Sequence, residues 1–149
     1  MKVYLDTSVL NVYLFGKFSD IEVDRFPTVS DLFTLINSGK VHAIVSLYSI
    51  QEIYSFCKKI FHHEVGHVAR LSFLKLLNNE IELSGLLSRE ERLLHRAKFI
   101  LDDLSDEPHA ISAFLNKCDA IVTYDEHFQK IKDILPVYAP EELVSNIVS

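Results

Sequence analysis

The chain has 149 residues, of which 48% are hydrophobic, and a formal net charge of -6. This length allows one compact domain with a sizeable core, and the charge argues against tight nonspecific binding of nucleic acid through bulk electrostatics. No apolar run approaches the ~20 residues that cross a bilayer, and the N-terminus has no secretory pattern, so we expect a soluble cytoplasmic protein.

The first predicted strand, residues 2–5, is apolar and stops at Asp6, Thr7 and Ser8. Residues 9–15 then have a helical pattern that ends near Gly16. In an open α/β sheet, the carboxyl ends of parallel strands form the edge that holds ligands and metals. Asp6 is therefore in a position to take part in binding or catalysis. Because acids and hydroxyl residues also dominate helix N-caps, a purely capping role is the alternative.

The middle of the chain continues this alternation. Residues 18–27 predict a loop or irregular helix, and a helix of about three turns begins at Ser30. A second buried strand is predicted at 42–48, and the helix from Ser49 to Ile60 carries Glu52 in its first turn. Residues 62–104 are mostly helical, including one helix over 89–104, with a short strand at 81–83.

The last third repeats the pattern of the first. Asp106 and Glu107 precede Pro108, which is typical of a helix start. Residues 119–125 predict a strand that ends in Asp125, followed by an amphipathic helix over 127–135, a strand at 137–139 and a helix over 140–147. Strands alternating with helices predict parallel βαβ units with helices on both faces of the sheet.

Four acids occupy strand ends or helix starts, and we expect them to converge at one edge of the sheet. They are Asp6, Glu52, Asp106 and Asp125. Carboxylates gathered in this way repel one another, which raises their pKa values unless a cation neutralises them. Oxygen ligands completed by water suit Mg²⁺ or Mn²⁺ rather than zinc.

Fragments around these acids, in this order, resemble the PIN-domain family of metal-dependent ribonucleases. They are Val-Tyr-Leu-Asp6-Thr-Ser, Ser-Ile-Gln-Glu52-Ile, Asp106-Glu-Pro-His-Ala-Ile-Ser-Ala and Ala-Ile-Val-Thr123-Tyr-Asp125-Glu-His-Phe128. The length also fits a stand-alone PIN protein such as a VapC-type toxin. The resemblance implies a three-layer α/β/α sandwich with a mainly parallel sheet. From the length and the helical pattern we expect a single domain over residues 1–149, with a helical insertion or cover at about 61–104.

The activity implied by this resemblance is Mg²⁺- or Mn²⁺-dependent endoribonuclease, acting as the toxin of a toxin-antitoxin pair or in RNA processing. The implied catalytic and metal-binding residues are Asp6, Glu52, Asp106 and Asp125, supported by the hydroxyls of Ser8 and Thr123. RNA is the implied substrate, and an antitoxin protein and a second copy in a homodimer are the partners left open. The family's frequent extra acid after the fourth is replaced here by His127. The candidates for phosphate contacts are Arg89, Arg92, Arg96, Lys98 and Lys117, and a solvated helix face is the alternative for each of them.

Two alternatives remain at this stage. A PIN-like module that binds RNA or protein without cutting is one, and the presence of all four acids argues against it. The other is a zinc metallopeptidase, because His63, Glu64 and His67 match H-E-x-x-H, in which two histidines bind Zn²⁺ and the Glu polarises water. The extended form of that motif fails, since Arg70 and Phe73 stand where Gly and His belong.

Overall fold

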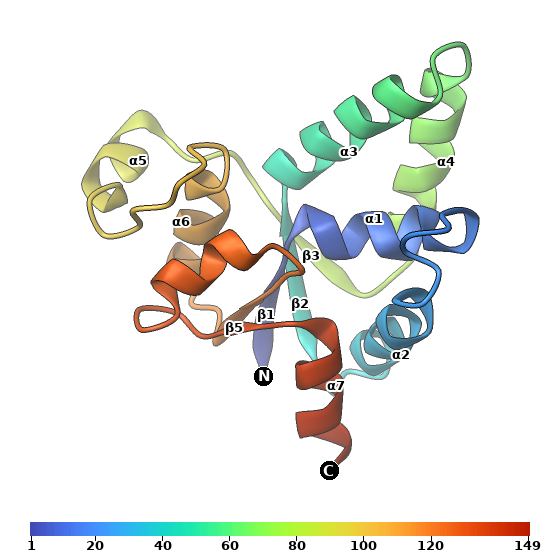
Figure 1. Cartoon of the computed structure of the whole chain (residues 1–149). Helices are drawn as coiled ribbons and strands as arrows, with labels where there is room; N and C mark the ends of the chain where they lie inside the picture. Colours follow the sequence, from blue (N-terminus) through green and yellow to red (C-terminus); the bar gives the residue numbers. More distant parts are fainter.

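The computed structural model describes all residues from Met1 to Ser149. Its strands form one parallel sheet of five in the order β3-β2-β1-β4-β5 (Figure 1). The strands are β1 (Lys2–Leu5), β2 (His42–Ser46), β3 (Ile81–Ser84), β4 (Ala120–Val122) and β5 (Val137–Tyr138). The parallel α/β sheet expected from the alternating pattern is therefore confirmed.

Helices cover both faces of this sheet. They are α1 (Thr7–Phe15), α2 (Phe26–Asn37), α3 (Leu47–Ile60), α4 (Val65–Leu77), α5 (Arg89–His95), α6 (Glu107–Leu115) and α7 (Pro140–Val148), with 3-10 turns η1 (Gly16–Phe18) and η2 (Glu126–Ile131). Side chains alternate along a strand, so Val3 and Leu5 enter one core while Tyr4 enters the other. The first core is covered by α1 to α4 and α7, and the second by α6 and η2. These layers confirm the α/β/α sandwich.

The predicted helix over residues 89–104 is wrong beyond His95. The following segment is irregular, and it buries Phe99 and Leu101 in the second core while Ile100 remains 75% exposed. Side chains two residues apart point to different sides of a helix, so Phe99 and Leu101 could not both be buried on one helix face. Packing of Phe99 against Phe114 of α6 therefore favours the irregular conformation. Two smaller differences are that α2 begins at Phe26 rather than Ser30 and that residues 126–131 form a 3-10 turn instead of an amphipathic helix.

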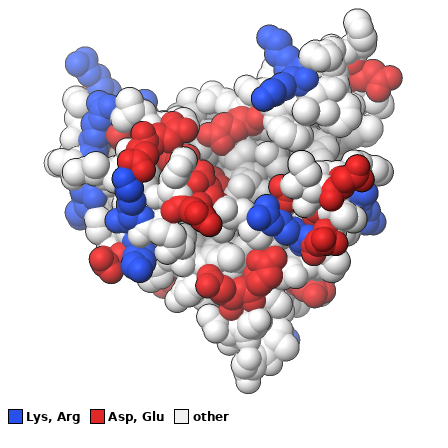
Figure 2. All heavy atoms as spheres, in the orientation of Figure 1, with Lys and Arg blue, Asp and Glu red and all other residues white.

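The carboxyl edge of the sheet lies between two projections of the chain. On one side α3 and α4 form a helical hairpin, and on the other α5 and α6 stand beside η2 (Figure 1). Acidic side chains gather on the face between these projections (Figure 2). None of the helices has both the length and the apolar character that crossing a membrane requires.

Candidate active site

Asp6 lies where β1 meets α1 and has the capping role that was considered for it. It caps α1, because its Oδ2 accepts hydrogen bonds from the Ser8 amide at 3.3 Å and the Ser8 hydroxyl at 2.7 Å. The Thr123 hydroxyl donates a third hydrogen bond to the same oxygen at 2.8 Å. All three donors use Oδ2, so Oδ1 of this buried carboxylate is free for a ligand.

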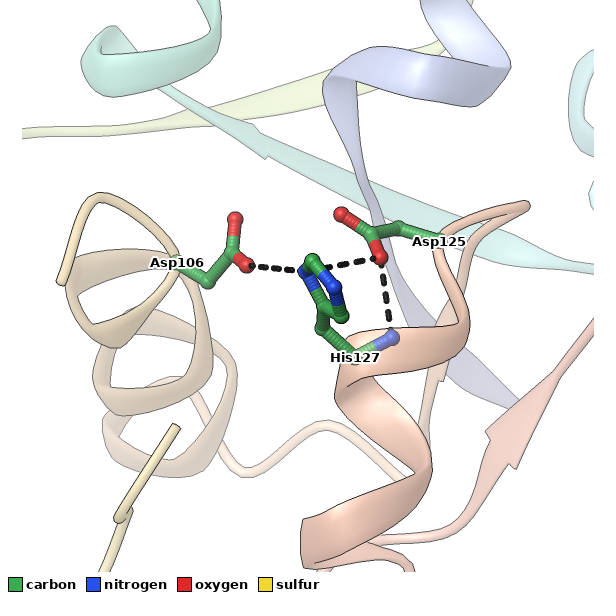
Figure 3. Close-up of side chains that lie close together, drawn as sticks. All are labelled: Asp106, Asp125 and His127. Atoms are coloured by element: carbon green, nitrogen blue, oxygen red, sulfur yellow. Dashed lines mark hydrogen bonds and ion pairs between the residues drawn. The ribbon is translucent and has the colours of Figure 1, made fainter. Parts of the chain in front are cut away.

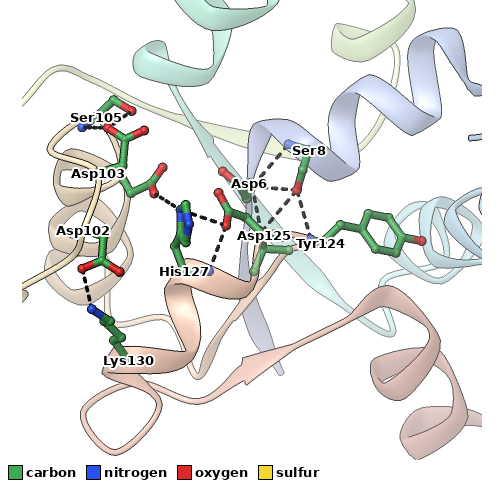
Figure 4. A network of polar contacts seen from close by, with 11 residues as sticks. Asp6, Ser8, Asp102, Asp103, Ser105, Tyr124, Asp125, His127 and Lys130 are labelled. Carbon is green, nitrogen blue, oxygen red and sulfur yellow. Dashed lines mark hydrogen bonds and ion pairs between the residues drawn. The ribbon is translucent and has the colours of Figure 1, made fainter. Parts of the chain in front are cut away.

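Two hydroxyls join the end of β1 to the end of β4. Thr123 Oγ1 accepts a hydrogen bond from the Asp125 amide at 2.9 Å while its proton goes to Asp6. Ser8 Oγ accepts one from the Tyr124 amide at 3.0 Å (Figure 4). Strand pairing supports this junction, since the Asp6 amide donates to the Val122 carbonyl at 3.0 Å. Ser8 and Thr123 therefore set the relative positions of Asp6 and Asp125.

Asp106, Asp125 and His127 converge from two sides of the edge (Figure 3). Their possible ligand atoms all lie within 4.8 Å of one another. Asp106 Oδ2 is buried and has no hydrogen-bond partner. Burial is the main cause that raises the pKa of this carboxyl to about 7, and the charges of Asp125, Asp103 and Asp6 act in the same direction.

Glu52 lies in the first half of α3, and its two oxygens are held by different elements. Oε2 accepts a hydrogen bond from the Thr7 hydroxyl at 2.5 Å, and Oε1 lies 2.7 Å from Nε2 of His109 on α6. The other ring nitrogen of His109 is 2.6 Å from the Tyr4 hydroxyl. Burial would raise the pKa of Glu52, but the hydrogen bond and charge of His109, with the Thr7 hydrogen bond, lower it. Hydrogen bonds to both oxygens thus hold Glu52 in place as a carboxylate. It lies outside the cluster of Asp106, Asp125 and His127.

Two further residues, outside the predicted catalytic set, lie near these acids. His109 stands three residues after Asp106. Residues at that spacing share a helix face, so the sequence alone indicates that His109 lies near Asp106. Asp103 lies near the same edge (Figure 4), and its charge contributes to the raised pKa of Asp106. It lies on an irregular segment, where no periodicity indicates which way a side chain points.

The structure shows contacts within the protein for two of the basic residues that are candidates for phosphate contacts. Arg96 Nε forms an ion pair with the buried carboxylate of Glu107 at 3.2 Å. Lys98 lies over the ring of Phe114, 4.3 Å from its centre. Arg89 and Arg92 line a cavity of about 360 Å³ beside Glu107 and remain candidates for contact with RNA.

The H-E-x-x-H segment does not have the geometry of the zincin motif. His63 lies in a turn, Glu64 precedes the first residue of α4, and only His67 is within that helix. The two histidines are thus not one turn apart on a continuous helix. The residues that could share a metal ion are instead Asp106, Asp125 and His127.

Comparison with solved structures identifies the fold. VapBC2 from Rickettsia felis, in a complex with a promoter DNA fragment, superposes with a TM-score of 0.63 at 16% identity, covering 93% of this chain and 98% of that one. VapC20 of Mycobacterium tuberculosis, described as a sarcin-ricin loop cleaving toxin, gives 0.61 at 14% identity over 86% and 93%. A domain of a functionally unknown Methanocaldococcus jannaschii protein gives 0.52 at 16% identity over 93% and 89%.

These likenesses show a PIN-domain fold, and within that class the fold is VapC-like. The fold that the sequence resemblance implied is therefore confirmed. Comparison of the sequence with family models and with curated proteins gives no match.

Proposed function

We propose that this protein is an endoribonuclease that hydrolyses RNA phosphodiester bonds with the help of Mg²⁺ or Mn²⁺. The observation that carries the proposal is the buried Oδ2 of Asp106, which has no hydrogen-bond partner and lies close to Asp125 and His127 at the carboxyl edge of the sheet. An anionic oxygen without a hydrogen bond is costly to bury, and a cation bound there would relieve that cost. The fit between these residues and a divalent ion is good, because the donors are mainly carboxylate oxygens.

The residues proposed to hold the ion are Asp6, Glu52, Asp106 and Asp125. A bound divalent cation lowers the pKa of a water molecule and neutralises the oxygen that leaves the phosphorus atom. The protein's part is orientation: Thr7 and His109 fix the Glu52 carboxylate, and Ser8 and Thr123 fix that of Asp6. The VapC-like fold supports RNA as the substrate, since VapC20 is described as cleaving the sarcin-ricin loop.

An antitoxin-like protein is the partner that we propose. An apolar groove of about 740 Å³ lies between α1, η1, α3 and α4, and none of the three clustered residues Asp106, Asp125 and His127 lines it. Phe18 at its rim is 87% exposed, and Lys75 lines one side. Apolar walls with a lysine fit an amphipathic helix that carries acidic residues. The solved VapBC2 complex shows a VapC-like fold together with a second protein, which supports this type of partner.

This groove also leads toward the acids. A smaller cleft of about 220 Å³ shares Phe15, Ser19 and Phe56 with it and reaches Ser8, the residue that donates to Asp6. A segment bound in the groove can therefore extend toward the catalytic edge. The same partner would then inhibit the nuclease, because its bound segment would lie close to the acids.

The test of the nuclease is cleavage of single-stranded RNA by the purified protein in the presence of Mn²⁺ or Mg²⁺. Asp6→Asn and Asp106→Asn should each abolish cleavage, because an oxygen ligand loses its charge while the side-chain shape is kept. Circular dichroism should show that both variants remain folded. His63→Ala is the control and should cleave as the parent does.

Cleavage that persists in both Asp variants would contradict the proposal. Cleavage that disappears only in His63→Ala would instead favour the zinc alternative. RNA binding without cleavage of any RNA, including a total cellular RNA pool, would support the non-catalytic PIN-like module.

A further inference from the structure

The ring of His127 is placed toward two of the acids. Its Nδ1 lies 3.4 Å from Asp125 Oδ1 and 3.9 Å from Asp106 Oδ2 (Figure 3). Asp125 Oδ1 also accepts a hydrogen bond from the His127 backbone amide at 2.9 Å, which holds the carboxylate and the imidazole on the same turn of chain. The imidazole therefore meets a carboxylate from its own turn and one from the start of α6.

These separations match those of atoms that share one metal ion. In an octahedron with metal–ligand distances of about 2.1 Å, ligand atoms are about 3.0 Å apart on adjacent positions and about 4.2 Å on opposite ones. Both distances from Nδ1 fall within that span. The second, independent observation is Asp106 Oδ2, because this oxygen belongs to a residue that is only 9% exposed and has no hydrogen-bond partner.

We propose that His127 Nδ1 is a metal ligand and that it makes this site bind Mn²⁺ more tightly than Mg²⁺. This inference rests on the proposed function and names which of the two ions the site selects. Mg²⁺ strongly prefers oxygen ligands, whereas imidazole nitrogen suits transition metals. The oxygen-rich remainder of the set, with Asp106, Asp125 and nearby Asp6, suits Mn²⁺ among those metals.

The alternative is that a positively charged His127 forms ion pairs with Asp106 and Asp125 and takes the place of a metal cation. The side chain is 54% exposed, so such a pairing would cost little desolvation. The two arrangements differ in one observable. A ligand has its nitrogen bonded directly to the metal, whereas an imidazolium is displaced when the ion binds.

Pulsed electron paramagnetic resonance of the Mn²⁺-loaded full-length protein separates them. The parent protein should show hyperfine coupling between the manganese electron spin and a ¹⁴N nucleus. In His127→Asp that coupling should vanish while Mn²⁺ still binds. Calorimetric titrations with each ion alone should show that the preference for Mn²⁺ over Mg²⁺ falls by about tenfold in this variant.

His95→Gln is the matched control, because it changes a histidine outside the cluster, and it should leave both readings unchanged. A parent protein that binds Mn²⁺ without ¹⁴N coupling would overturn the inference, and so would coupling that persists in His127→Asp. The parent spectrum decides the point even if the variant is unstable. RNA cleavage without nitrogen ligation would refute only the role of His127, and nitrogen ligation without cleavage would refute only the nuclease. Absence of Mn²⁺ binding would refute the role of His127, and absence of both Mn²⁺ and Mg²⁺ binding would refute the nuclease as well.

Discussion

At the scale of single residues, the carboxyl of Asp106 is strongly altered by its surroundings. Its pKa is raised by burial and by neighbouring acids to about 7 from an ordinary value of 3.8. The protonated form is therefore favoured in the folded state. The resulting stability is complete below the unfolded pKa and is lost as the pH rises through about 7.

Replacement of Asp106 by Asn should accordingly stabilise the metal-free protein above pH 7. We expect a gain on the order of 1 kcal/mol, or about 2–4 °C in melting temperature, after allowance for solvent screening. At pH 4 the gain should disappear, because the parent carboxyl is then neutral as well. Melting curves in EDTA at both pH values measure the difference, and the exposed Asp133→Asn is the control. Equal melting temperatures at pH 8 would show that this carboxylate is not crowded.

At the scale of elements, one chain of hydrogen bonds links the strand and helices that carry the acids. Tyr4 of β1 contacts His109 of α6, which contacts Glu52 of α3, which in turn accepts from Thr7 of α1. His109 is almost completely buried. Its removal would leave the Tyr4 hydroxyl without this partner and one oxygen of Glu52 unpaired.

His109→Ala should therefore destabilise the protein by about 2–3 kcal/mol in urea denaturation. His42→Ala is the control, since that histidine also contacts a glutamate but is largely exposed. Burial would lower the pKa of His109, yet its hydrogen bond to Glu52 raises it, whereas the pKa of Glu52 is lowered. The stabilisation should be greatest between the ordinary values of 4.5 and 6.5 and should decrease as the pH rises further. A loss equal to that of His42→Ala would contradict the linking role.

Local patterns predict these elements unevenly. Strand β1 with Asp6 and strand β4 with Asp125 follow directly from apolar runs that end in acids, because such runs are buried between helices. The helix beyond His95 is mispredicted because Phe99 and Leu101 pack individually against the second core. The contact between Glu52 and His109 joins residues 57 positions apart, and local periodicity does not report such pairs.

For the molecule as a whole, the acidic edge and the ion proposed for it link stability to metal. Binding to the folded state alone stabilises it by about 2.7 kcal/mol when the free ion is at 100 times its dissociation constant. We expect Mn²⁺ to raise the melting temperature more at pH 8 than at pH 5.5, since Asp106 is charged only at the higher value. Scanning calorimetry with Mn²⁺ or EDTA measures this. An equal rise at both pH values would argue that the ion binds elsewhere.

The position of β1 in the middle of the sheet sets the order in which this protein can be completed. The strand made first, at residues 2–5, pairs with β4 at residues 120–122, and the Lys2 amide donates to the side chain of Asp119. Asp6 consequently gains its Thr123 partner only when most of the chain has left the ribosome. A growing chain therefore has no assembled acidic edge before residues 120–125 are made, and the proposed cutting activity would arise only after they pair with β1.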